Sequence, residues 1–430
     1  MEIERMYATT VCNLFVNYYQ KNGHQLLSSA SLLDPSIPMS FVMSAGLVQV
    51  EKSLAQIKNR ESDKYVLVQK CFRHFDVDKV GNDETHLSFF MMPGAFIFGE
   101  NDRSQIIQQM WQFATNILEL PQERLWASYF QGDMVLNTQM EEDLPTRSTW
   151  LDMGLPPERV VGLGKKHNFW IQGNGLQGNA ESRKCGPNTE LFYDKGEEYA
   201  CDKNCLPGCN CGRFVEFSNT LFIRHQTDHI RQELIPIAIP FTETVVGAER
   251  AAMLTDGVSS VFKTKEYSYI SDVICSFIDQ SHITKPDKQK HVKVISDHLK
   301  ALYHLVSDGA PPPGKDGRQR IIKILIRRIF ARQMLLGITS ASFLRETIRA
   351  IASYESTPAS SETCPKLESY FAEETARFSK TITRGRIQIE NILSQNNNNR
   401  LSLEQISILE TQGGIPGILT DSILESLHAK

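Results

Sequence analysis

Apolar residues recur at helical spacing in several parts of the chain. A helix with one buried face repeats its apolar positions every three to four residues. This pattern predicts helices over residues 4–22, 103–118, 291–307 and 317–336. Gly23 follows the first and the Asp308-Gly309 pair follows the third, where helices typically end. The helical pattern continues from residue 251 to the end, so we expect an all-helical C-terminal domain.

Residues 68–100 follow the pattern of strand, turn and strand. The first strand ends at Arg73, an acidic turn surrounds Gly81, and the return strand carries His86 and Phe90. An arginine can hold a phosphate through two hydrogen bonds, and an aromatic ring can cover a base. These residues therefore suggest a nucleotide clamp. An ordinary hairpin with a charged tip has the same pattern, and the residues alone leave both interpretations open.

Four further segments have less regular patterns. Residues 28–49 predict a loop and a strand, because two X-Pro pairs favour extended or turn geometry. Residues 141–164 are polar and interrupted by prolines, which predicts a helix and loops at the surface. Residues 215–223 predict a strand. The glycines and asparagines of residues 173–179 predict a mobile loop, either a lid over a binding site or an insertion without function.

Composition narrows the class of protein. A chain of 430 residues with 41% hydrophobic and 22% charged residues fits two or three globular domains. The net charge of −4 gives no overall basic field, so any nucleic-acid contact needs a local patch. No apolar run reaches the roughly 18 residues of a membrane span, and the start lacks a secretion signal. We expect a cytosolic protein without membrane contact.

Four of the nine cysteines are clustered between residues 201 and 211. Disulfides are not expected in the cytosol, and four thiolates suit a tetrahedral structural zinc ion. The predicted ligands are Cys201, Cys205, Cys209 and Cys211, with Cys185 as a substitute ligand. Free buried thiols or a redox pair are the alternatives. The nearby His225 and His229 are four residues apart, a pair more typical of a solvent-facing stretch than of metal ligation.

The residues of the strand pair resemble motif 2 of the class II aminoacyl-tRNA synthetases. These are Arg73, Asp76, and His86 followed four positions later by Phe90. Their surroundings resemble the alanyl branch in Ser44-Ala45-Gly46-Leu47, Phe89-Phe90-Met91-Met92, and Cys185-Gly186-Pro187 with Glu190 and Asp194. Residues 242–250, TETVVGAER, resemble motif 3, in which an arginine begins a helix.

This resemblance implies an α+β fold. An antiparallel sheet flanked by helices would form a catalytic domain over residues 1–255. A helical tRNA-recognition-like domain would follow over residues 256–430. The resemblance covers nearly all of this chain but about the first half of a full-length member, so we expect the editing and C-terminal domains of the family to be missing.

The resemblance also implies roles for individual residues in forming an aminoacyl-adenylate from ATP. Arg73 would hold the α-phosphate, His86 the outer phosphates and Arg250 the γ-phosphate, with Mg²⁺ bridging phosphate oxygens. Arg250 and Phe90 would enclose the adenine. Arg73 and Arg250 are thus the predicted catalytic residues. The small amino acid would be bound by Trp170, Asn219, Leu221 and Glu243.

Several residues depart from the family pattern. The family has a valine at Leu221, an aspartate at Glu243 and a glycine at Val245; Ser218 replaces a tryptophan and Met91 a glutamate. One methylene in a binding site contributes only about 1–3 kcal/mol of discrimination, so alanine stays a candidate beside glycine or an altered substrate.

Residues 294–336 resemble the helical domain with which the family grips the acceptor stem of tRNA. Basic residues of this region have no acid within the helix to pair with, which favours phosphate contact. The predicted tRNA-binding residues are Lys315, Arg318, Arg320, Lys323, Arg327 and Thr411; Arg328 and Arg332 are also predicted to point outward. Lys315 and Thr411 stand near the family's asparagine and aspartate, which read a G·U pair, so that readout is expected to be lost.

Three functions remain open at this point. The first is activation of alanine or a similar small amino acid and its transfer to tRNA. In the second, a stand-alone paralogue passes the activated amino acid to another acceptor. The third is a non-catalytic tRNA-binding protein. The sequence gives no indication of the oligomeric state.

Overall fold

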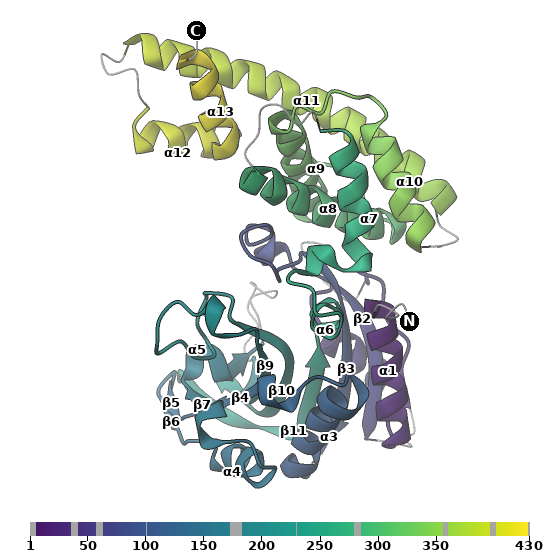
Figure 1. The fold of residues 1–430 in the computed structure, drawn as a ribbon, viewed down its shortest axis with the longest axis vertical. Helices are drawn as coiled ribbons and strands as arrows, with labels where there is room; N and C mark the ends of the chain where they lie inside the picture. The colour runs from purple at the N-terminus through teal and green to yellow at the C-terminus, as the bar shows by residue number, and fades with distance from the viewer. Residues whose placement is uncertain are drawn as a thin grey trace. The chain divides into compact units, whose positions relative to one another are not determined.

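The computed structural model describes residues 6–35, 42–56, 63–99, 101–172, 183–228, 230–278, 285–355, 360–395 and 401–428. The chain divides into two compact units (Figure 1). Unit 1 comprises residues 1–73 and 83–266, and unit 2 comprises residues 74–82 and 267–430. The boundary therefore lies within a helix, α7 (Lys265–Ser276), and the short segment His74–Asn82 belongs to the second unit.

Unit 1 is built on a mixed sheet in the order β1-β2-β3-β11-β10-β9-β4-β7, with β8 paired to β9. Its strands are β1 (Gln25–Leu26), β2 (Lys64–Phe72), β3 (Phe89–Phe98), β4 (Leu125–Phe130), β7 (Val160–Leu163), β8 (Phe169–Ile171), β9 (Lys184–Asp194), β10 (Phe214–Asp228) and β11 (Glu233–Val246). The inner pairs are antiparallel, as predicted, whereas the pairs β1–β2 and β4–β7 are parallel. A small sheet pairs β5 (Asp133–Val135) with β6 (Thr138–Met140).

The helices of unit 1 confirm two predictions. They are α1 (Ala8–Lys21), α2 (Leu47–Gln56), α3 (Arg103–Gln112), α4 (Leu144–Asp152), α5 (Lys165–Asn168) and α6 (Ala248–Thr255). Helix α1 is followed by Gly23 with φ +84°, a conformation that glycine adopts without strain. Asp102 caps α3 by accepting from the backbone N–H of Ser104, and a π-helical turn, Phe113–Ile117, continues it.

Two sequence predictions in unit 1 were wrong. The described part of residues 28–49 contains no strand, because single backbone hydrogen bonds, from Met43 N–H to Leu32 and from Phe72 N–H to Met43, replace a ladder. Residues 141–164 are not all at the surface. Trp150 of α4 is fully buried and donates to Thr189 Oγ1 at 2.8 Å, and β7 joins the sheet.

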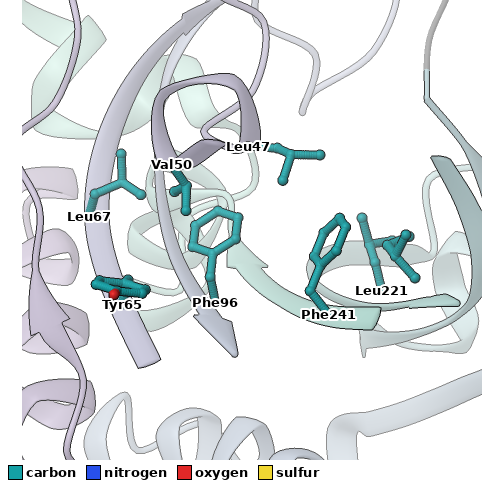
Figure 2. Packing of buried hydrophobic residues seen from close by; sticks show 8 residues of the cluster. Leu47, Val50, Tyr65, Leu67, Phe96, Leu221 and Phe241 are labelled. Atoms are coloured by element: carbon teal, nitrogen blue, oxygen red, sulfur yellow. The ribbon is translucent and has the colours of Figure 1, made fainter. Parts of the chain in front are cut away.

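One face of the sheet packs on an apolar cluster. Leu47 and Val50 of α2 meet Tyr65, Phe96, Phe241 and their neighbours on four strands (Figure 2). The opposite face is polar at its centre, where the hydroxyls of Thr220 and Thr244 are 3.0 Å apart, and α1 and α3 contact the sheet. The first of these faces carries most of the predicted site.

Unit 2 is helical in its described residues, as predicted. It contains most of α7, then α8 (Lys285–Ser307), α9 (Gly317–Leu335), α10 (Phe343–Glu355), α11 (Ser360–Gln395), α12 (Leu403–Thr411) and α13 (Gly417–His428). An apolar cluster joins α9, α11, α12 and α13 through Ala331, Phe378, Ile389, Leu409, Ile415 and Leu419. Within the described residues, none of the helices has the length and apolar composition that a membrane span requires.

Gly385 allows a close contact in this cluster. A Cβ at this position of α11 would lie 1.6 Å from Cδ1 of Ile415, a side chain that is 1% exposed. We expect Gly385→Ala to lower the free energy of unfolding of unit 2 by about 1–3 kcal/mol, because the overpacked core must shift. Far-UV circular dichroism during urea unfolding measures this, with the exposed Ser379→Ala as a control on the same helix. A more stable Gly385→Ala variant, as helix propensity alone predicts, would contradict the contact.

Candidate functional site: one face of the sheet in unit 1

The strand register places three of the predicted amino-acid-binding residues in cross-strand pairs that are close together in the sheet. Leu221 of β10 lies opposite Glu243 of β11, and Glu243 lies opposite Phe96 of β3. Asn219 lies opposite Val245, one row further along. Because side chains two positions apart share a face, these residues point to the same side of the sheet.

Phe90 lies on this same face, since it is six positions from Phe96 on β3. Arg73, directly after β2, places its guanidinium carbon 4.9 Å from the centroid of the Phe90 ring. Its Nε donates to the carbonyl oxygen of Ser44 at 3.4 Å. The structure thus joins Arg73 and Phe90 in a cation–π contact, which fixes the orientation of the arginine.

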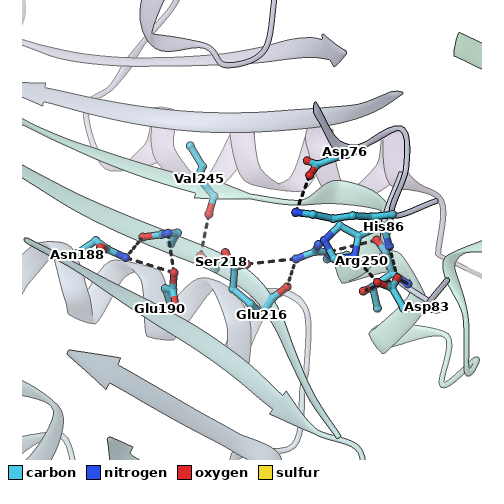
Figure 3. Close-up of polar contacts among 12 residues, drawn as sticks. Asp76, Asp83, His86, Asn188, Glu190, Glu216, Ser218, Val245 and Arg250 are labelled. Atoms are coloured by element: carbon cyan, nitrogen blue, oxygen red, sulfur yellow. Dashed lines mark hydrogen bonds and ion pairs between the residues drawn. The ribbon is translucent and has the colours of Figure 1, made fainter. Parts of the chain in front are cut away.

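Arg250 is the third residue of α6, which begins directly after β11. Its Nη1 donates to the backbone oxygen of Glu216 at 2.8 Å and to Glu216 Oε2 at 3.3 Å (Figure 3). Its Nε donates to the backbone oxygen of Thr85 at 3.4 Å. Because Thr85 lies in the segment between β2 and β3, this bond ties Arg250 to that segment.

His86 is oriented by Asp83. The Nδ1 atom of His86 is hydrogen-bonded to Asp83 Oδ2, and Asp83 Oδ1 accepts from the backbone N–H groups of Thr85 and His86 (Figure 3). Burial raises the pKa of Asp83, but the bonds from His86 and Thr85 outweigh it and hold the pKa below its usual range. The ring of His86 is half-exposed.

Glu243 is 3% exposed, and burial raises its pKa from 4.5 to about 8, against the opposing positive charge of Arg73. No other described residue forms a hydrogen bond or ion pair with its carboxyl group. A buried carboxyl group of this kind is suited to a cationic ligand, because an ammonium group would restore its ionised form.

A polar network beside Asn219 was not predicted from the sequence. Asn188 Nδ2 donates to Glu190 at 3.3 Å and to Asn219 at 3.1 Å, and Asn219 Nδ2 donates to Glu190 at 3.1 Å (Figure 3). Burial and the charge of Glu216 raise the pKa of Glu190. The string from Cys185 to Asp194 contained Glu190, but nothing in the linear pattern showed that the pairing of β9 with β10 would bring these groups together.

Glu249 was also missed. It is 2% exposed, and its two carboxylate oxygens accept from the backbone N–H of Met91 at 2.9 and 3.1 Å. This bond links the start of α6 to β3. Glu249 is the residue before Arg250, and only the tertiary contact distinguishes the two charged neighbours.

Trp170 of β8 is half-buried and packs against the apolar cluster that contains Leu221. Trp170 and Leu221, two of the residues predicted to bind the amino acid, therefore lie in or against the same apolar cluster. The glycine- and asparagine-rich loop, residues 173–179, lies outside the described residues, and so does His229.

The four clustered cysteines meet in space. The sulfur atoms of Cys201, Cys205, Cys209 and Cys211 all lie within 4.8 Å of one another. Two pairs are 3.3 Å apart, too far for a disulfide, whereas Zn–S bonds of about 2.3 Å place the sulfurs of a tetrahedral site about 3.8 Å apart. Four sulfur donors in this arrangement fit a zinc ion without an open position for catalysis.

Cys185 does not belong to this group. It is fully buried in another cluster with Phe130, Phe169 and Leu234, and burial raises the pKa of its thiol to about 12. The hypothesis of Cys185 as a substitute ligand is therefore wrong for the described structure. His225 is half-buried rather than solvent-facing, and burial lowers its pKa.

We expect one zinc ion per chain, and its removal should loosen the 195–213 loop. Chelation or Cys209→Ser should lower the thermal midpoint, because the loop adds few apolar side chains of its own to the core. Atomic absorption and differential scanning calorimetry with and without chelator measure both effects. Cys364→Ser is the matched control outside the cluster. A metal-free protein with an unchanged midpoint would contradict the zinc site.

The residues of unit 2 that were predicted to bind tRNA differ in their exposure and in their partners. Lys315 and Arg320 are exposed, Arg318 and Lys323 half-buried, and Thr411 is exposed at the end of α12. Arg327 pairs with the buried Glu374 at 2.6 Å and lies over the Phe378 ring at 4.7 Å. Burial, followed by the charge of Arg327, lowers the pKa of Lys323.

Two residues of α9 do not point outward as predicted. Arg332 is 7% exposed, and Arg328 donates to Asp78 and to the backbone oxygen of Val77. They lie about 100–140° around the helix from Arg327, where α9 faces protein rather than solvent. The prediction failed because the absence of acidic residues within α9 does not show which groups of other segments its arginines will contact.

The fold, an antiparallel sheet core flanked by helices and followed by a helical unit, is consistent with the class II tRNA synthetase family. Residues 10–430 match the family tRNA synthetases class II (A), and the chain belongs to it. The chain is 30% identical over 433 residues to the alanine–tRNA ligase of Alkaliphilus metalliredigens, covering 98% of this chain and 46% of that protein. The alanine–tRNA ligase of Leptospira biflexa is 32% identical over 391 residues, covering 89% and 40%. The chain thus spans about half the length of the curated relatives it matches.

Among solved structures, the apo histidyl-tRNA synthetase of S. aureus is similar at 11% identity with a TM-score of 0.34, covering 60% of this chain and 67% of that one.

Proposed function

We propose that this chain activates alanine, or a similar small amino acid, with ATP and transfers it to the 3′ end of a tRNA. The proposal is carried by one observation: Glu243, a buried carboxyl group without a partner among the described residues, shares a sheet face with Asn219 and with the Phe90 ring that holds Arg73. An anion for the amino group and a cation for phosphate are what adenylate formation requires at neighbouring positions.

In the first step, an oxygen of the amino-acid carboxylate attacks the α-phosphorus of ATP, and pyrophosphate leaves with the electrons of the broken bond. Arg73 would hold the α-phosphate, and His86 and Arg250 the outer phosphates. In the second, a ribose hydroxyl of tRNA attacks the acyl carbon and AMP leaves. Little covalent work is left to the protein, so orientation and charge neutralisation carry the rate.

Glu243 would bind the α-ammonium group, and Asn219 would be held in place for the substrate by Glu190 and Asn188. Leu221 and Trp170 would enclose a small side chain. Glu190 and Glu216 are carboxylates near Arg250. They would hold Mg²⁺, which would supply positive charge to the phosphates.

The tRNA would contact unit 2 through exposed or half-exposed cations of α9 and its preceding turn, Lys315, Arg318, Arg320 and Lys323. Arg327 would contribute less, because its guanidinium is already paired with Glu374. Thr411, which is exposed at the end of α12, would also contact the acceptor stem. The cytosolic location stays a prediction from the sequence.

A different acceptor is the second candidate function. Lys315 and Thr411 replace the two residues that read a base pair in the family, and lysine contacts phosphate without distinguishing bases well. A third candidate, a non-catalytic tRNA-binding protein, has Met91 and Val245 in its favour.

Pyrophosphate exchange with each of the twenty amino acids tests the activation step. We expect exchange with alanine or glycine. Exchange with none of the twenty would reject activation of a standard amino acid and favour the non-catalytic protein.

Charging of total tRNA tests the acceptor, with the wild type beside Lys315→Asn and Thr411→Asp. Charging by the wild type supports the tRNA ligase. Robust exchange with no charging by any of the three proteins would favour the paralogue with another acceptor.

A further inference from the structure

The segment between β2 and β3 leaves unit 1 and returns to it, and its tip is packed tightly within unit 2. Val77 and Val80 of this tip, His74–Asn82, are 7% and 1% exposed. Gly81 has φ +83°, and a Cβ there would lie 2.8 Å from Cγ2 of Val294 and 3.1 Å from the backbone oxygen of Lys290. The tip therefore lies directly against α8, with no room for a side chain at Gly81.

Arg328 of α9 holds the tip from a second direction. Its Nη2 donates to the backbone oxygen of Val77 at 2.8 Å, and its Nη1 donates to Asp78 Oδ1 at 2.5 Å. Asp78 is 89% exposed, so its ion pair with Arg328 adds little by itself. The bond to the backbone of Val77 does not depend on a side chain of the tip and is the stronger anchor.

The orientation of Arg328 is fixed from the interior of unit 2. Its Nε donates to Nε2 of His298 at 2.9 Å, so the His298 proton lies on Nδ1, which donates to Asp297 at 2.8 Å. Both residues are fully buried, and burial lowers the pKa of His298 to about 4, which keeps Nε2 an acceptor at neutral pH. Each of the three guanidinium nitrogens therefore donates one hydrogen bond in a fixed geometry, which a lysine cannot reproduce.

The two ends of this segment carry predicted nucleotide contacts. Arg73 precedes the tip, and its backbone N–H donates to the backbone oxygen of Ser88 at 2.8 Å. This bond joins the two ends of the segment between β2 and β3. On the return, Asp83 orients His86, and Thr85 accepts from Arg250. The chain from residue 83 to 86 is only one to four peptide units from Asn82, so a short stretch of chain connects the tip to these residues.

We propose that Arg328 is a positioning residue for the ATP site: by anchoring the tip in unit 2, it sets the return segment that presents His86 and the acceptor oxygen for Arg250. This inference rests on the proposed function for its consequence in catalysis, but its structural part stands without it. It links a residue of α9, the helix predicted to meet tRNA, to the phosphate-binding strand pair through covalent continuity of one segment.

Amide hydrogen exchange tests the structural part on the full chain. We compare the wild type with Arg328→Ala, Arg328→Lys, Gly81→Ala, and the control Arg386→Ala, which removes a surface ion pair of α11. In the first three variants the amides of Thr85 and His86, which donate to Asp83, should exchange about tenfold faster, as should those of the tip. The control should match the wild type. Faster exchange confined to residues 74–82 would overturn the proposal.

Equilibrium ATP binding and pyrophosphate exchange test the consequence. Arg328→Ala and Gly81→Ala should raise the Kd and KM for ATP about tenfold and leave the KM for the amino acid unchanged, a separation that general destabilisation would not produce. Full recovery with Arg328→Lys would show that charge alone matters and would reject the three-bond anchor. A wild type that neither binds ATP nor exchanges pyrophosphate would reject the proposed function, while the hydrogen-exchange result would still decide the anchor.

Discussion

Replacing Arg250 by alanine is expected to lower amino-acid-dependent pyrophosphate exchange by about a thousandfold, because a positioned arginine is a major source of charge stabilisation in reactions at phosphate. Arg250→Lys keeps the charge but cannot bridge the carbonyl and carboxylate of Glu216 and the backbone of Thr85 at once. We expect an intermediate loss, about a hundredfold, for the lysine variant. Initial rates at saturating ATP and amino acid measure both.

The matched control is Arg231→Ala, since Arg231 belongs to the same unit, its side chain is 72% exposed, and among the described residues its guanidinium has one distant ion-pair partner, Asp228 at 3.9 Å. Its exchange rate should equal that of the wild type. Exchange by Arg250→Ala within threefold of the wild type would remove Arg250 from the catalytic residues and with it the main support for motif 3 chemistry in this chain.

Glu243→Gln is expected to change both stability and substrate binding. The folded-state pKa of Glu243 is raised from 4.5 to about 8 by burial, so between pH 5 and 8 the folded protein holds a proton that the unfolded chain has released. The free energy of unfolding of the wild type should therefore fall as pH rises across this window, by about 1.4 kcal/mol per pH unit from this group. In Glu243→Gln this contribution should disappear.

Urea unfolding at pH 5.5, 6.5, 7.5 and 8.5, followed by tryptophan fluorescence, measures the slope. All four tryptophans, at positions 111, 126, 150 and 170, belong to unit 1, so the signal reports on the unit that contains Glu243. Glu233→Gln, an exposed glutamate on the same strand, is the control. Equal slopes for the wild type and Glu243→Gln would contradict the raised pKa.

The same variant tests the role of Glu243 in binding. If Glu243 takes the α-ammonium group, its carboxyl group must ionise on binding, and the KM for the amino acid should decrease as pH rises toward 8. Glu243→Gln should raise this KM about a hundredfold, because a charged partner is lost in a buried place, and should leave the KM for ATP unchanged. A rise in the KM for ATP alone would place Glu243 in the nucleotide site.

Local patterns were enough to predict the separate elements of the site. The alternation in residues 68–100 predicted two strands, although β3 begins at Phe89 and leaves out His86, and the resemblance of residues 242–250 to motif 3 implied that Arg250 stands at the start of a helix. These features depend on neighbours within a few residues, which the linear order contains. The spacing of Cys201 to Cys211 likewise predicted four sulfurs in one short loop, and they lie together.

The sequence by itself predicted most of the elements and the helical C-terminal part, because periodicity and turn residues are local, while the candidate site residues came from the resemblance of short motifs to a known family. Only the tertiary structure decided the partners: Glu190 and Asn188 beside Asn219, Glu249 on the backbone of Met91, and Arg328 on the tip of the segment between β2 and β3. The physical reason is that a charged side chain looks alike in sequence whether it faces water or a buried acceptor. Its energy depends on groups tens to hundreds of residues away, which the fold alone brings within hydrogen-bonding distance.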